Sequence, residues 1–113
     1  MKFAKNCFFI VIFIILFASC TVRLSEKRTR GMLDVILKDD LAVIVEGIDT
    51  AVVLEKPYYE YVKFNKYEEG QYQYLAEVNF YFFKDMKLKI VRKYRFDKYY
   101  LKWERYYNKY ESY

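Results

Sequence analysis

The chain has no histidine, and its 113 residues include three glycines, two cysteines and one proline. Histidine is the side chain that most often acts as a general base in catalysis. Without it, no Ser–His or Cys–His nucleophile can be assembled. Three scattered glycines provide no glycine-rich loop that could hold phosphate groups. We therefore expect a protein that binds a partner and is not an enzyme, with no metal and no dissociable cofactor.

The first twenty residues have the layout of a secretory signal sequence. Lys2 and Lys5 form a basic start, an apolar run extends from Cys7 to Phe17, and small residues precede Cys20. A positive start, an apolar core of roughly 7–15 residues and a small-residue cleavage site are typical of such signals. The apolar run is shorter than the roughly 20 residues that span a bilayer, which disfavours an uncleaved membrane anchor.

The segment Phe17-Ala18-Ser19-Cys20 resembles the lipobox of bacterial lipoproteins. The resemblance implies cleavage after Ser19, a diacylglyceryl thioether on Cys20 and an N-acyl chain, such as palmitate, on the new N-terminus. Phe17 departs from the leucine that the family usually has there. Several acyl chains anchor a protein more firmly than one does, so the mature protein would stay on the exported side of a membrane. The sequence leaves open whether this is the inner or the outer membrane, and an ordinary secretory signal is the alternative.

Charge and composition divide the chain into three parts. We predict a signal peptide over residues 1–19, a basic membrane-proximal tether over 20–31, and a single α+β domain over 32–113. Basic residues beside a membrane are attracted to anionic head groups by about 1 kcal/mol each. Within the domain, acidic residues dominate 33–79 and basic residues dominate 84–113. This segregation permits head-to-tail self-association.

Residues 25–46 carry the apolar spacing of an amphipathic helix. Ser25 is a suitable N-cap and Gly47 a suitable stop. The β-branched runs on either side of Gly47 leave a hairpin over residues 41–55 as the alternative. The stripe that predicts the helix consists of Leu33, Leu37, Leu41, Ile44 and Ile48.

The second half alternates apolar and polar residues with a period of two, which is typical of half-buried antiparallel strands. The predicted strands are the segments 58–67, 72–82 and 86–96 and a last strand that starts at residue 99 and carries the C-terminal tyrosines, and the short Lys84-Asp85 and Asp97-Lys98 separations predict tight hairpins. The sum is α+β: an N-terminal helix packed on a four-stranded antiparallel meander, an order compatible with cystatin-like or NTF2-like folds. Envelope lipoproteins that pair two helices with three strands are the competing architecture.

All fourteen tyrosines lie between Tyr58 and Tyr113. The alternation places some aromatic residues in the core, namely Tyr72, Tyr74, Tyr94, Tyr99 and Trp103. Other tyrosines are interleaved with basic residues near the C-terminus, and tyrosine and arginine are enriched as anchors of protein interfaces. The predicted binding surface consists of Tyr100, Lys102, Arg105, Tyr106, Tyr107, Lys109 and Tyr110.

Three partners are compatible with this surface. An envelope protein is the first, and a glycan, either peptidoglycan or a surface polysaccharide, is the second because sugars can stack on aromatic rings. Nucleic acid, the third, is bound by the same combination of stacking rings and positive charge, but an exported protein does not encounter it. Inhibition of an exported hydrolase is disfavoured where the hydrolase is itself basic, because like charges slow the encounter.

Overall fold

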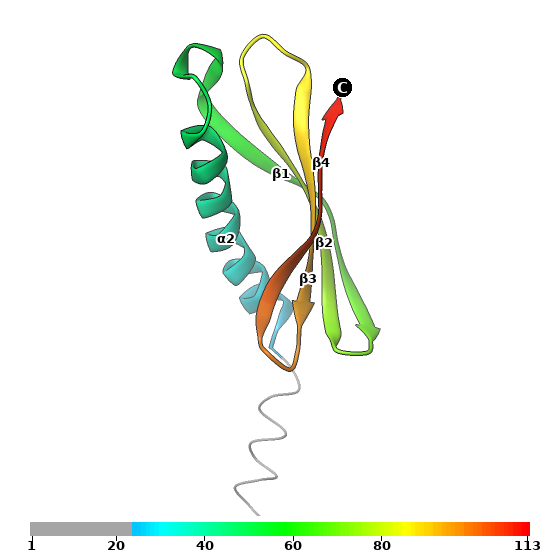
Figure 1. The fold of residues 1–113 in the computed structure, drawn as a ribbon. Helices are drawn as coiled ribbons and strands as arrows, with labels where there is room; N and C mark the ends of the chain where they lie inside the picture. Colours follow the sequence, from blue (N-terminus) through cyan, green and yellow to red (C-terminus); the bar gives the residue numbers. More distant parts are fainter. Residues whose placement is uncertain (1–23) are drawn as a thin grey trace, which may run out of the picture.

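The computed structural model describes residues 24–113, so the predicted signal peptide, Cys20 and the first part of the tether lie outside the described residues. Within this range, helix α2 (Glu26–Glu46) and a short 3-10 turn, η1 (Thr50–Val52), precede an antiparallel sheet of four strands in the order β1-β2-β3-β4 (Figure 1). The α+β class with a four-stranded meander is thus confirmed. The strands are β1 (Val53–Glu69), β2 (Tyr72–Phe83), β3 (Leu88–Asp97) and β4 (Lys102–Ser112).

Helix α2 begins and ends where the sequence predicts. The Ser25 hydroxyl accepts a hydrogen bond from the Arg28 backbone N–H at 3.2 Å, as an N-cap does, and Gly47 follows the last helical residue. Leu33 and Leu37 are fully buried. The alternative hairpin over residues 41–55 is therefore wrong. The predicted boundary between tether and domain, after residue 31, falls inside α2.

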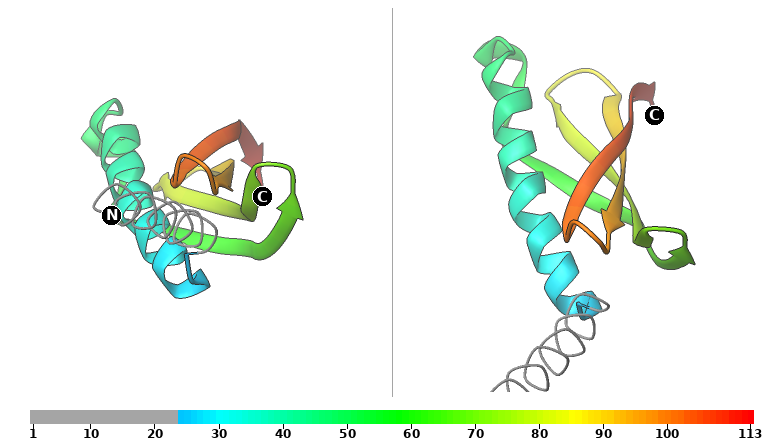
Figure 2. Two further views of the ribbon diagram at one scale, coloured as in Figure 1. Left: turned by 90° about the horizontal axis from the view of Figure 1, so that it is seen from below. Right: turned by 60° about the horizontal axis from the view of Figure 1, so that its bottom comes forward.

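Helix α2 lies along one face of the sheet (Figure 2), and the buried side chains of the core lie between the two. Successive side chains of a strand point to opposite faces, so one face of β2 and β3 receives the apolar residues. Fully burying one such side chain contributes about 1.5–3 kcal/mol to stability. The predicted alternation is confirmed for Ala76, Val78, Phe80, Phe82, Ile90, Tyr94 and Phe96, all of which are buried.

Trp103 joins the last strand to the helix. Its indole Nε1–H donates to the Thr29 carbonyl oxygen at 2.8 Å, across 74 residues of sequence. Its ring lies 5.3 Å from that of Phe96 and 5.7 Å from that of Phe64, between ring centroids. The prediction that Trp103 belongs to the core is confirmed.

Two aspartates of α2 accept hydrogen bonds from tyrosines of the sheet. Tyr59 and Tyr61 both donate to the Asp34 carboxylate, and Tyr94 donates to Asp40 Oδ2 at 2.7 Å. Burial, together with the neighbouring carboxylates, raises the pKa of the Tyr61 and Tyr94 phenols above their usual value. These hydroxyls therefore remain protonated donors over the physiological range, and they hold α2 against β1 and β3.

The turns differ from the predicted tight hairpins. The β2–β3 and β3–β4 connections are four residues each (84–87 and 98–101), so β4 begins at Lys102 and not at residue 99. Tyr99 consequently lies in a turn and is 66% exposed, which corrects its assignment to the core. Tyr72 is half-buried and packs outside the core cluster, beneath Arg95.

Candidate functional site

One face of the sheet is packed against α2. Among residues 24–113 no helix covers the opposite face, which we call the open face (Figure 2). Val62 of β1 and Tyr107 of β4 belong to the two edge strands, yet both line one hollow of about 160 Å³ on this face. The sheet therefore curls toward the open face. This curl explains why Asn79 and Val91 are 8% and 5% exposed without a helix above them.

A bulge in β4 brings two neighbouring tyrosines onto the open face. Lys93 pairs with Tyr107 and Tyr94 pairs with Arg105, so Tyr106 is an extra residue in the ladder. An extra residue of this kind re-aims side chains along the bulged strand. Tyr106 and Tyr107 therefore both lie on the open face, where simple alternation would have separated them.

Each of these two tyrosines lies beside a cation from β3. The Lys93 ammonium is 4.8 Å from the Tyr107 ring centroid, and the Arg95 guanidinium is 5.2 Å from that of Tyr106. Cation–π contacts of this kind contribute about 0.5–1 kcal/mol each at exposed sites. They favour the observed positions of the two rings.

Charges of both signs alternate across the middle of the open face. Lys63, Glu77, Lys93 and Tyr107 are directly paired from β1 to β4 and form one row. The Lys93 Nζ lies 3.6 Å from Glu77 Oε1. A second hollow of about 220 Å³ shares Lys63, Glu77 and Lys93 with this row and is also lined by Tyr106. The face thus offers donors and acceptors side by side and is not uniformly basic.

Arg95 is the most tightly held cation of the open face. Its guanidinium lies 4.2 Å from the Tyr72 ring centroid as well as near Tyr106, and its Nη2 donates to Glu104 Oε1 at 3.2 Å. Its buried Nε has no hydrogen-bond partner within the described part of the chain. A planar guanidinium packed on aromatic rings is pre-organised, so Arg95 would lose little of its own side-chain entropy on forming further hydrogen bonds.

The structure divides the predicted binding surface among three places. Tyr106, Tyr107 and Lys109 lie on the open face, the last by its pairing with Val91. Arg105 and Tyr110 pair with the buried Tyr94 and Ile90, which places them on the side of β4 that faces α2. The remaining two residues, Tyr100 and Lys102, belong to the β3–β4 turn and to the first position of β4.

Sequence reasoning did not nominate the β1, β2 and β3 residues that complete the open face. Their signal was present in the polar positions of the alternation, which mark the side of each strand away from the core. The missing information was which strands are neighbours and how the sheet curls. These residues are Lys63, Glu77, Lys93 and Arg95. Tyr72 also lies on the open face, although alternation assigned it to the core, because the β2–β3 ladder shifts register between Tyr72 and Tyr74.

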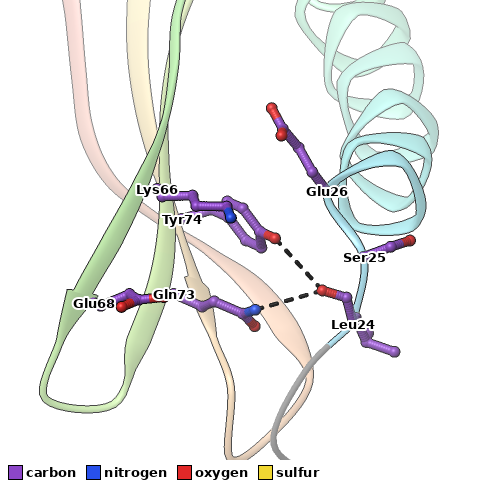
Figure 3. A pocket seen from close by; sticks show the side chains of 7 residues that line it. All are labelled: Leu24, Ser25, Glu26, Lys66, Glu68, Gln73 and Tyr74. Atoms are coloured by element: carbon purple, nitrogen blue, oxygen red, sulfur yellow. Dashed lines mark hydrogen bonds between the residues drawn. The ribbon is translucent and has the colours of Figure 1, made fainter.

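A separate pocket of about 340 Å³ lies where the chain enters α2 (Figure 3). The Leu24 carbonyl oxygen accepts hydrogen bonds from Gln73 Nε2 at 3.4 Å and from the Tyr74 hydroxyl at 3.5 Å. Glu26 of the helix and Glu68 of β1 lie on its rim. The two hydrogen bonds fix the start of α2 against β2, so we assign the residues around this pocket a structural role.

Comparison of the chain with known protein families, curated proteins and solved structures finds no match. Over residues 24–113, no three side chains of the types that bind metals gather into a possible site. The helices described in this range include none that is long and apolar enough to cross a membrane.

Proposed function

We propose that this protein is a bacterial envelope lipoprotein, anchored by acylated Cys20, whose domain binds an envelope protein without catalysing a reaction. The proposed docking surface is the open face around Tyr106 and Tyr107. The absence of histidine from the sequence supports a binding role over catalysis. The observation that carries the proposal is the pair of adjacent tyrosines, each held by a cation, beside alternating charges.

A protein partner suits this face better than a partner of uniform charge does. Tyrosine and arginine are enriched in protein interfaces, where they act as anchors that combine a large contact area with polar groups. The Lys93–Glu77 and Arg95–Glu104 pairs present both signs within a short distance, which favours a partner of matching pattern.

The edges of the sheet are poorly suited to pairing with another strand. The β1 ladder shifts register between Tyr61 and Lys63 and contains Pro57, while β4 is bulged at Tyr106. Bulges and proline on edge strands interrupt the row of free backbone groups that strand addition requires. We therefore propose docking through the open face and not through an edge.

Glycan binding through Tyr106 and Tyr107 is the alternative, supported by the 44% exposure of Tyr106.

We also propose that the order of elements, a helix followed by a four-stranded meander, is of the cystatin-like or NTF2-like kind. An experimental structure compared strand by strand with those folds would test this.

The anchor is tested by the intact mass of the protein extracted from membranes. We expect a chain that begins at Cys20 and carries acyl groups, and we expect the Cys20→Ala chain to lack that added mass. An unmodified mass for the native chain would contradict the lipid anchor but leave the docking surface untouched.

The docking surface is tested by photo-crosslinking in the source bacterium. A photoreactive phenylalanine at Tyr107 is expected to form a discrete protein adduct, and the same residue at Val35 is not. Val35 is a matched control because it is 62% exposed on α2, away from the open face. Adducts at both positions, or at neither, would contradict protein docking. Co-sedimentation with purified sacculi that is lost in Tyr106→Ala/Tyr107→Ala would support the glycan alternative.

A further inference from the structure

The β3–β4 turn (98–101) presents two of the most exposed aromatic side chains of the described chain. Tyr99 is 66% exposed and Tyr100 is 72% exposed. Lys98 Nζ lies 5.7 Å from the Tyr99 ring centroid, and Lys102 Nζ lies 5.6 Å from that of Tyr100. Aromatic rings paired with lysines at the surface combine an apolar body with a positive charge.

The turn is rigid, because its backbone is held from inside the domain. The buried Asp97 carboxylate accepts hydrogen bonds from the backbone N–H of Tyr99 at 2.8 Å and of Tyr100 at 3.1 Å. The Lys98 N–H donates to the Gln71 carbonyl oxygen at 2.8 Å. Leu101 has a φ of 53°, in the left-handed region that a non-glycine residue adopts only where its surroundings hold it. The two tyrosines are therefore displayed by a fixed scaffold.

This turn lies at the end of the domain where the chain enters it. The β3–β4 turn lies beside the start of α2 in Figure 1, and the bond from Trp103 to Thr29 ties the two together. Cys20 precedes Leu24 by four residues, which span at most about 14 Å when fully extended. A lipid anchor on Cys20 therefore keeps this end within reach of the membrane surface.

We propose that the turn carrying Tyr99 and Tyr100, flanked by Lys98 and Lys102, docks on the head-group region of a bilayer that contains anionic phospholipid. This inference rests on the proposed lipid anchor at Cys20. Tyrosine prefers the interface between water and hydrocarbon because its ring is apolar and its hydroxyl is polar. Lysines near an anionic surface add an attraction that operates over about one Debye length.

The charges around the turn limit the contact to one part of this end. Lys27 and Arg28 are exposed on the first turn of α2, next to the exposed Glu26, and add net positive charge to this end of the domain. Glu68 and Glu69 precede the β1–β2 turn and carry the opposite charge. Docking by the β3–β4 turn and the start of α2 would direct the β2–β3 turn, at the other end of the sheet, away from the membrane (Figure 1).

The test uses a tryptophan probe and lipids brominated near the head group. The protein extracted from membranes is reconstituted into vesicles of phosphatidylcholine and phosphatidylglycerol as Tyr100→Trp or as Met86→Trp, and the fluorescence of the protein without either substitution is subtracted. Met86 is the matched control because it is 53% exposed in the β2–β3 turn. We expect bromolipid quenching for Tyr100→Trp and none for Met86→Trp. Since both positions are exposed turns, circular dichroism should show unchanged folding.

The outcomes separate the turn from the anchor. Intact mass of the same samples reports whether Cys20 is acylated, whatever the quenching result. Acylated protein with no quenching at position 100, or with equal quenching at positions 100 and 86, would overturn docking by the turn. Adding Lys98→Gln and Lys102→Gln to Tyr100→Trp should reduce quenching on the anionic vesicles, and undiminished quenching would overturn the role of the lysines.

Discussion

Replacing Trp103 by alanine should destabilise the domain by about 3–5 kcal/mol, as truncation of a buried tryptophan or phenylalanine typically does. Trp103 is 7% exposed, packs against Phe64 and Phe96, and donates to the Thr29 carbonyl. Such a loss is a large share of the 5–15 kcal/mol that ordinary domains possess. We expect Trp103→Ala to be partly or wholly unfolded already in the absence of urea. Urea titrations followed by far-UV circular dichroism would measure this.

Two further variants define the origin of the loss. Trp103→Phe keeps an apolar ring but removes the indole N–H. It should therefore lose less stability than Trp103→Ala, and about 0.5–1.5 kcal/mol of its loss should come from the missing hydrogen bond. Tyr100→Ala alters a neighbouring side chain that is 72% exposed, and it should change stability by less than about 0.5 kcal/mol. A Trp103→Ala protein as stable as Tyr100→Ala would show that β4 does not hold α2.

The second large effect is expected at Asp40. Its Oδ2 lies 3.2 Å from Arg92 Nη1, and it also accepts the hydrogen bond of the buried Tyr94 hydroxyl. Arg92 is 8% exposed, lies over the Phe80 ring, and donates from Nε to Asn108 Oδ1 at 2.7 Å. Asp40→Ala would leave this guanidinium buried without a carboxylate. Removing one partner of a buried ion pair costs about 3–5 kcal/mol of stability. Because Asp40 is partly exposed, we expect Asp40→Ala to cost about 2–4 kcal/mol.

Asp39→Ala is the matched control, since Asp39 is the exposed neighbour of Asp40 on the same helix, and its removal should have little effect. The stability of Asp40→Asn should lie between those of the native protein and Asp40→Ala, because the amide oxygen can still accept the hydrogen bond of Tyr94. Adding Arg92→Leu to Asp40→Ala should recover part of the loss by removing the unpaired charge. A double variant less stable than Asp40→Ala would contradict this origin. Denaturant midpoints at neutral pH measure all four.

The elements that depend on local sequence could be predicted. Ser25 and Gly47 mark the ends of α2, and the four-residue spacing of Leu33 and Leu37 marks its inner side. In β2, alternation identifies the buried face from Tyr74 to Phe82, because the extra residues of the β1–β2 ladder lie on β1 and leave the alternation of β2 intact. Capping and periodicity act over a few residues, so they can be read without knowledge of the tertiary structure.

The candidate site could be predicted only in part, because it depends on register and curvature. The bulges at Val62 and Tyr106 each shift one edge strand by a residue, and a single-residue shift exchanges the faces of all later side chains. Alternation therefore separates Tyr106 from Tyr107, which the structure places together. Outside the candidate site, Arg92 shows the same dependence on tertiary structure: it occupies an apolar position on the α2 side of β3 because Asp40, distant in sequence, lies opposite it.

The 74-residue separation of Trp103 and Thr29 bears on the order of folding during synthesis. The three strand pairings join neighbouring segments, so each hairpin can form soon after its second strand appears. Helix α2 is made first, but its docking surface is complete only when the last strand has arrived. Until then the apolar stripe of Leu33 and Leu37 lacks its full cover, and chaperones or other chains compete for it. Truncation before Trp103 should thus weaken docking of the helix and leave an aggregation-prone chain.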